Sequence, residues 1–172
     1  MNTKNKLHAS IQQEVRNRNT LNEERKDLSI LLVENSEEWI AIAEQVVRQY
    51  LKHIVFNSTY TGYIIHSTAN PHHATEILFM ENIDVTISDI NLTKRMDNID
   101  GLEIFIPDAR KIYSGPLIAW SEDKKYDFKA RKAGADEFII KDRHNYIDFV
   151  KTFDLFLNPR SYHNRNRKWE SK

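Results

Sequence analysis

Polar side chains that could do chemistry follow directly after apolar runs of this sequence. If these runs are neighbouring parallel strands, their carboxyl ends meet at one edge of a sheet. Two carboxylates, an amide, a hydroxyl and an ammonium would then come together. Asp89 is either a reactive carboxylate held at a strand end or only the polar residue that begins a loop. The residues of interest are Glu34, Asn35, Asp89, Ser121 and Lys141.

Each of these residues also has a purely structural interpretation. An aspartate at a strand end often begins a turn or caps a helix. Ser121 could cap a helix over the sequence EDKK, and a lone lysine such as Lys141 is usually solvated. The adjacent His72 and His73 have no third ligand at a useful spacing, so we interpret them as helix surface.

Five short apolar runs predict the strands that would position these residues. Most are continuous stretches of Ile, Leu and Val rather than alternating ones, which is typical of strands covered on both faces of a parallel sheet. The runs are residues 28–33, 63–67, 84–88, 116–121 and 137–141.

Segments with helical spacing lie between and after these runs. Ser36 suits an N-cap and Pro71 suits a first helical turn, whereas Gly134 suits a C-terminal stop. Pro107 must kink or divide the helix in which it lies. The alternation of strand and helix predicts a doubly wound α/β domain with right-handed crossovers. The helical segments lie within residues 36–51, 71–80, 101–113, 123–135 and 146–157.

Four pieces of sequence, taken in order, resemble the receiver domain of response regulators in two-component signalling. The resemblance covers roughly residues 28–157 and implies a flavodoxin-like, five-stranded parallel sheet in the order 2-1-3-4-5, with helices on both faces. It also implies a phospho-acceptor signalling domain rather than an enzyme. The pieces are ILLVEN, SDINL followed by DGLEIF, PLIAWSE and KAGADEFIIKD.

The resemblance implies a role for the polar residues at the strand ends. Asp89 would be the phospho-acceptor, whose carboxylate attacks the phosphorus of a phosphohistidine. Glu34 and Asn35 would hold Mg²⁺ together with Asp89 and the backbone carbonyl of Asn91. Such an ion neutralises charge as the phosphoryl group arrives.

Three further residues match positions that act on the phosphoryl group or respond to it. Lys141 would pair with the phosphoryl oxygens as a point charge. Ser121 would donate a hydrogen bond to the phosphoryl group and draw its loop inward. Phe138 occupies the position of the aromatic switch residue, although it fits a core position equally well.

The sequence departs from the family's pattern around this pocket. Asn35 stands in place of a second acid, which removes one negative charge and should weaken Mg²⁺ binding without abolishing it. The loop after Asp89 lacks the usual proline and is longer, and Asp142 rather than proline follows Lys141. Two interpretations remain: a phosphorylatable receiver with altered metal affinity, or a pseudo-receiver that acts as a phosphorylation-independent adaptor.

Composition sets the outer limits on function. A chain of 172 residues that is 40% hydrophobic fits one globular domain. There is no apolar run of about 18 residues, so we expect no membrane span. The absence of cysteine excludes disulfides and thiolate chemistry and suits a cytoplasmic location.

The net charge of zero hides an acidic body between basic ends. We divide the chain into a polar N-terminal arm (1–27) that could be helical, a receiver domain (28–157) and a basic tail (158–172). Homodimerisation through the arm is a hypothesis. The expected partners are a histidine kinase or histidine phosphotransfer protein and a downstream protein target. Nucleic-acid binding through the basic ends is disfavoured by the acidic body.

Overall fold

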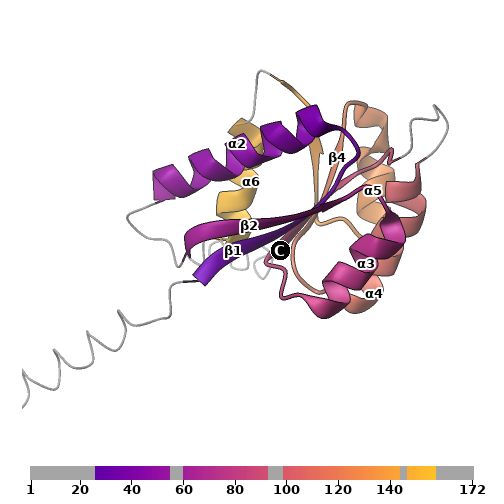
Figure 1. Ribbon diagram of the computed structural model, residues 1–172. Coiled ribbons are helices and arrows are strands. Elements are labelled where there is room, and N and C mark those ends of the chain that lie inside the picture. Colours follow the sequence, from indigo (N-terminus) through magenta and orange to yellow (C-terminus); the bar gives the residue numbers. More distant parts are fainter. Residues whose placement is uncertain (1–25, 55–59, 93–98, 144–146, 158–172) are drawn as a thin grey trace, which may run out of the picture.

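The protein is described by a computed structural model in which residues 26–54, 60–92, 99–143 and 147–157 are placed. Its five strands are all parallel and form one sheet in the order β2-β1-β3-β4-β5 (Figure 1). This confirms the predicted doubly wound sheet and its strand order. The strands are β1 (Lys26–Val33), β2 (Tyr60–Thr68), β3 (Val85–Asp89), β4 (Leu117–Ser121) and β5 (Glu137–Ile140).

Helices cover both faces of the sheet, as the continuous apolar strands predict (Figure 1). Successive residues of β1 point to opposite faces: Leu32 packs in one core cluster and Leu31 in the other. The first cluster lies beneath α2 (Glu37–Ile54) and α6 (Ile147–Leu157). The second lies beneath α3 (Pro71–Met80), the short helix η1 (Gly101–Phe105), α4 (Ile106–Ile112) and α5 (Asp127–Ala133).

Pro71 and Gly134 take the helix-boundary positions predicted for them. Asn70 caps α3, with its side-chain oxygen accepting the backbone N–H of His72 at 2.9 Å, and Pro71 opens the helix. Gly134 ends α5 with a φ of 123°, a conformation that residues with a Cβ rarely adopt. His72 and His73 are exposed, which agrees with their interpretation as helix surface.

The helix that contains Pro107 changes its hydrogen-bond pattern next to the proline. Residues Gly101–Phe105 form the π-helix η1, and α4 follows at Ile106 with no gap, since Phe105 and Ile106 both keep right-handed helical φ and ψ. Proline lacks a backbone N–H and its ring clashes with the preceding turn of a regular α-helix, so a local π-helical turn is one way to accommodate it. The helix is thus not divided at Pro107; its hydrogen bonding changes there instead.

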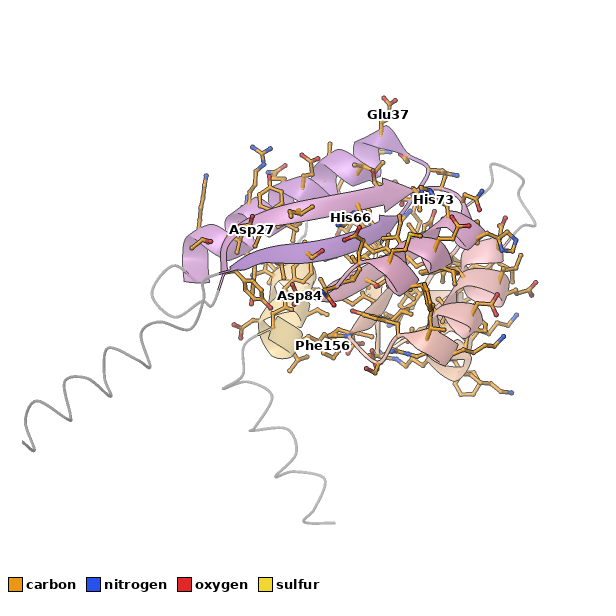
Figure 2. All side chains as sticks on the ribbon, turned by 60° about the horizontal axis from the view of Figure 1, so that its bottom comes forward. Asp27, Glu37, His66, His73, Asp84 and Phe156 are labelled. Carbon is orange, nitrogen blue, oxygen red and sulfur yellow. The ribbon has the colours of Figure 1, made fainter. Side chains whose placement is uncertain are left out.

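The two ends of the sheet carry different elements. In Figure 2, Asp27 and Asp84 lie toward the amino ends of the strands, whereas Glu37 and His73, near the starts of α2 and α3, lie toward the carboxyl ends. The carboxyl edge is thus the side on which the helices begin and the polar strand-end residues lie.

The loop after β3 returns to the strand that it leaves. The backbone N–H of Gly101 donates to the carbonyl oxygen of Ile90 at 3.1 Å. A Cβ at Gly101 would collide with the backbone carbonyl of Asp89, so no larger residue fits without a backbone shift. The intervening residues 93–98 lie outside the described part of the chain.

The predicted ends of the chain are not covered by the structure. Residues 1–25 of the N-terminal arm and the whole basic tail, 158–172, lie outside the described residues. Within the described ranges, no helix has the length and apolar character needed to cross a membrane.

Candidate functional site

A pocket of about 440 Å³ opens at the carboxyl edge of the sheet. All the residues predicted from the strand ends line it, whereas Phe138, whose switch role comes from the resemblance, does not. It is lined by Glu34, Asn35, Asp89, Asn91, Ser121 and Lys141, with Ser36, Glu38, Trp39, Glu122, Asp123, Lys125, Tyr126 and Arg143 completing the wall and rim.

The centre of the pocket is a buried ammonium that bridges two carboxylates. The Nζ atom of Lys141 lies 2.6 Å from Oε2 of Glu34 and 3.0 Å from Oδ2 of Asp89. These three side chains are 4%, 0% and 8% exposed, so the interaction is shielded from water and salt. Glu34 directly follows β1, Asp89 ends β3, and Lys141 directly follows β5.

The strand register brings these side chains together. Val33 of β1 pairs with Ser88 of β3, so Glu34 and Asp89 occupy the next position on adjacent strands. The backbone N–H of Lys141 donates to the carbonyl oxygen of Ser121 at 2.9 Å, which extends the pairing of β5 with β4 by one residue.

Glu34 is fixed through both of its carboxylate oxygens. Oε1 accepts the backbone N–H groups of Asn35 and Ser36, each at 2.9 Å, while Oε2 accepts from Lys141. These backbone groups lie just before α2, whose N-terminus favours negative charge. Through these contacts Glu34 holds Lys141 and the start of α2 in place.

Asn35 ties the end of β1 to the loop that follows Asp89. Its Nδ2 atom donates to the backbone carbonyl oxygen of Leu92 at 2.6 Å. An ionised aspartate has no hydrogen to donate and would repel that carbonyl. The replacement of an acid by an amide thus creates a hydrogen bond between the two segments.

Burial raises the pKa of the Asp89 carboxyl above its ordinary value. The ammonium of Lys141 acts against this shift, and the carboxylate of Glu34 adds to it. Two buried carboxylates share one ammonium, so the cluster formed by Glu34, Asp89 and Lys141 has a net charge of −1 when all three are ionised.

The remaining oxygens fit a hard cation, although one carboxylate is missing from the set. Among the described residues, no group of three or more acidic, histidine or cysteine side chains is arranged to hold a metal. Asp89, Asn35 and Asn91 nevertheless supply carboxylate, amide and carbonyl oxygens in the pocket. The side-chain oxygen of Asn91 is buried and has no hydrogen-bond partner in the described structure. Oxygen donors of this kind are those that Mg²⁺ accepts.

Ser121 and Phe138 have different surroundings. Ser121 is buried at the pocket, and its Oγ atom accepts the backbone N–H of Asp123 at 3.3 Å. Its local capping interaction is therefore present alongside its place in the pocket. Phe138 is partly buried against the second core cluster, on the sheet face covered by α3, α4 and α5.

Sequence reasoning missed two tryptophans at the site. The Nζ atom of Lys141 lies 5.4 Å from the ring centroid of Trp39 and 5.1 Å from that of Trp120. The predicted helix within residues 36–51 contains Trp39 and the predicted strand 116–121 contains Trp120, and neither pattern indicates a contact with Lys141. A signal was available, because Trp120 directly precedes Ser121 and Trp39 lies in the first turn after the Glu34–Asn35 pair.

The fold and this arrangement of residues define the carboxyl-edge site of a flavodoxin-like signalling domain. The sequence matches the response regulator receiver domain family over residues 30–147, and the chain belongs to that family. It is thus a receiver domain of two-component signalling, a domain of the phospho-acceptor type rather than an enzyme. Comparison with curated proteins gave no match.

Solved structures with the same fold are similar to this chain at low sequence identity. The chemotaxis protein CheY4 of Vibrio cholerae is 18% identical with a TM-score of 0.57, covering 76% of this chain and 99% of its own. The response regulator TrrA of Thermotoga maritima, solved with Mg²⁺ and BeF, is 22% identical with a TM-score of 0.59 and covers 76% and 99%.

A third neighbour also carries a metal. The receiver domain of the sensor histidine kinase PA1611 from Pseudomonas aeruginosa, with magnesium coordinated in its active-site cleft, is 17% identical with a TM-score of 0.54. The match covers 76% of this chain and 98% of that domain. At these identities the neighbours establish the shared fold.

Restoring an acid at position 35 should strengthen Mg²⁺ binding. The N35D variant adds a carboxylate to the oxygen set, and we expect its Mg²⁺ dissociation constant to fall by about tenfold or more in a calorimetric titration. N70D is the matched control, because Asn70 caps α3 outside the pocket and aspartate can also cap a helix. Equal affinities for the wild type and N35D would contradict this account of Asn35.

Removing the bridging ammonium should destabilise the fold strongly. K141M leaves Glu34 and Asp89 buried without a cation, and we expect the free energy of unfolding in urea to fall by about 3–5 kcal/mol. Adding E34Q and D89N to K141M should recover much of this loss, since both buried charges are then removed. K151M, which breaks only an exposed pair with Asp148, should change stability little.

The raised pKa of Asp89 predicts a specific pH dependence of stability. The folded protein holds this proton more tightly than the unfolded chain, so stability should fall as pH rises through the pKa of Asp89 in the folded state. In EDTA, D89N should therefore be more stable than the wild type above that pKa. The difference should shrink toward the ordinary aspartate pKa of about 4. Urea unfolding across this pH range measures both curves, and parallel curves would contradict the prediction.

Proposed function

We propose that this receiver domain accepts a phosphoryl group on Asp89 from a histidine kinase or a histidine phosphotransfer protein, and signals through protein contacts. The observation that carries the proposal is the arrangement of Asp89, Ser121 and Lys141 in one pocket, with Lys141 already 3.0 Å from the Asp89 carboxylate. A nucleophile, a hydroxyl and a cation at one site suit transfer of a phosphoryl group.

The chemical step forms one bond and breaks one. An oxygen of the Asp89 carboxylate attacks phosphorus, an acyl phosphate forms, and the phosphorus–nitrogen bond of the phosphohistidine breaks with the imidazole as leaving group. The ammonium of Lys141 stabilises the charge on the transferring oxygens. The hydroxyl of Ser121 uses a lone pair for Asp123, so its hydrogen remains available for a phosphoryl oxygen.

The site would hold Mg²⁺ through Asp89, Asn35 and the backbone carbonyl of Asn91. Bound there, the ion would supply charge neutralisation to the incoming phosphoryl group. Both oxygens of Glu34 accept hydrogen bonds from the protein itself, so its contribution to the ion would be mainly electrostatic. The weaker oxygen set supports a lower metal affinity than a site with two ligating acids.

A response to phosphorylation would travel through the elements that follow β4. Asp123, which donates its N–H to Ser121, caps the short helix η2 (Lys124–Tyr126), and α5 follows directly. A shift of Ser121 toward the phosphoryl group would therefore pull on η2 and α5. Phe128 on α5 is 77% exposed, which supports a protein-contacting surface around the fourth and fifth strands and their helices.

A phosphorylation-independent adaptor is the second candidate. It is favoured by the hydrogen bond from Asn35 to Leu92, which joins β1 to the loop after β3 without a metal. Glu34 and Lys141 likewise hold the pocket together through protein groups alone. A pocket assembled in this way could keep one conformation and bind a partner through its surface.

Acetyl phosphate distinguishes these two functions. Incubation of the full chain with acetyl phosphate and millimolar Mg²⁺ should add one phosphoryl group by intact-mass measurement, and D89N should abolish the addition. D123N is the matched control, because it changes an acid on the pocket wall that is not the proposed nucleophile. No adduct on the wild type, together with no spectroscopic change on adding beryllofluoride, would favour the adaptor.

A further inference from the structure

We propose that Trp39 and Trp120 are positioning residues that hold the ammonium of Lys141 in place for the phosphoryl group. The functional part of this inference rests on the proposed phosphorylation of Asp89. The geometric part concerns only the lysine and the two indole rings, and it can be tested without phosphorylation.

The two rings and the lysine come from three different elements. Trp39 lies in the first turn of α2, Trp120 is the residue before the end of β4, and Lys141 follows β5. The Nζ atom is within 5.4 Å of both ring centroids, inside the range of a cation–π interaction. The rings pack edge to face, with centroids 5.2 Å apart and an interplanar angle of 72°.

The rings themselves are fixed by the core. Trp39 and Trp120 are 6% and 1% exposed, and both belong to the cluster beneath α2 and α6. Trp120 packs edge to face on Phe149 of α6 at 4.8 Å. We call the pair of rings, Trp39 and Trp120, the clamp. Because both rings are packed in the core, we expect the clamp to restrict how far the side chain of Lys141 can move.

Neutral rings suit a site that must receive an anion. A buried ammonium has lost its water and needs negative potential around it, which carboxylates or the faces of indole rings can provide. A third carboxylate would add a negative charge that repels the incoming phosphoryl group. The indoles stabilise the cation without adding net charge, so they allow Lys141 to be both buried and available.

The attraction between the clamp and the ammonium of Lys141 does not depend on the chemical state of Asp89. Asp89 loses its free carboxylate when it becomes an acyl phosphate, so one of the two anionic partners of Lys141 is altered during the proposed reaction. The indole rings undergo no such change. They would retain the ammonium near its starting position while its partner becomes a phosphoryl oxygen.

The first experiment compares aromatic and aliphatic replacements in the full chain. W39L and W120L should slow phosphorylation of Asp89 by acetyl phosphate by about tenfold each. W39F, which keeps an aromatic face, should recover part of that rate. F153L is the matched control, because Phe153 is buried in the same cluster but its ring makes no cation contact with Lys141 in the described structure. A rate for W39L and W120L equal to that of F153L would overturn the proposal.

The second experiment separates cation–π attraction from packing. Trp39 and Trp120 would be replaced by tryptophan with one, two or three ring fluorines, in a W169F background that removes the third tryptophan. Fluorine withdraws electron density from the ring face with little change in shape. The logarithm of the phosphorylation rate should fall steadily with fluorine number, whereas a purely structural role predicts no trend.

The geometry has its own test, which does not depend on phosphorylation. The ε-methylene protons of Lys141, assigned by their loss in K141R, should show ring-current shifts in the NMR spectrum that W39L and W120L reduce and F153L leaves in place. Unchanged shifts in both tryptophan variants would reject the clamp even if Asp89 is phosphorylated. Absence of any phosphoryl adduct on the wild type would reject the proposed function, and the shifts would then decide the clamp alone.

Discussion

The bridging of Glu34 and Asp89 by the ammonium of Lys141 is the constraint on which the site depends. A buried carboxylate is unfavourable without a partner, and here two of them share one cation. The interaction requires β1, β3 and β5 to end at matching positions of the sheet. It therefore connects strand register, core packing and pocket chemistry: a slip of one strand by one residue would separate the charges as well as misplace the apolar side chains.

Asn35 adds no charge to the cluster formed by Glu34, Asp89 and Lys141. The ionised side chains of Glu34, Asp89 and Lys141 have a net charge of −1, and a phosphoryl group on Asp89 would make this cluster more negative by about one charge. Under the proposed function, a divalent cation and the phosphoryl group together would bring the cluster of Glu34, Asp89 and Lys141 close to neutrality. The phosphorylated protein would then bind the metal more tightly than the unphosphorylated protein, because the charges of the phosphoryl group and the cation offset each other.

The sequence predicts the backbone of the site well because strand-end positions follow from topology. Continuous apolar runs predict buried parallel strands, and parallel strands bring Glu34, Asp89 and Lys141 to one edge. The contacts of Trp39 and Trp120 with Lys141 were not predictable in the same way. They depend on how α2 is rotated against the sheet and on which rotamers the core allows, and neither follows from hydrophobic spacing.

The hydrogen bond of Asn35 was beyond prediction for a related reason. An amide in place of an acid indicates a lost charge. That the amide N–H of Asn35 donates to Leu92 depends on where the chain places Leu92 after β3, which the sequence does not indicate. Pro107 shows the same limit, since the sequence predicts a kink or a break, whereas the structure keeps one helical path and inserts a π-helical turn before the proline. Local chemistry restricts the choices, and contacts between distant segments select among them.

The longer loop after Asp89 illustrates how these contacts protect the pocket. Before residues 93–98, the carbonyl oxygen of Leu92 accepts a hydrogen bond from Asn35. After them, the backbone N–H of Gly101 donates to the carbonyl oxygen of Ile90. Loop closure free energy grows only slowly with length, so extra residues between two fixed ends are tolerated at small cost. The geometry around Asp89 thus depends on the two hydrogen bonds and on the absence of a side chain at Gly101. It depends much less on the number of residues between them.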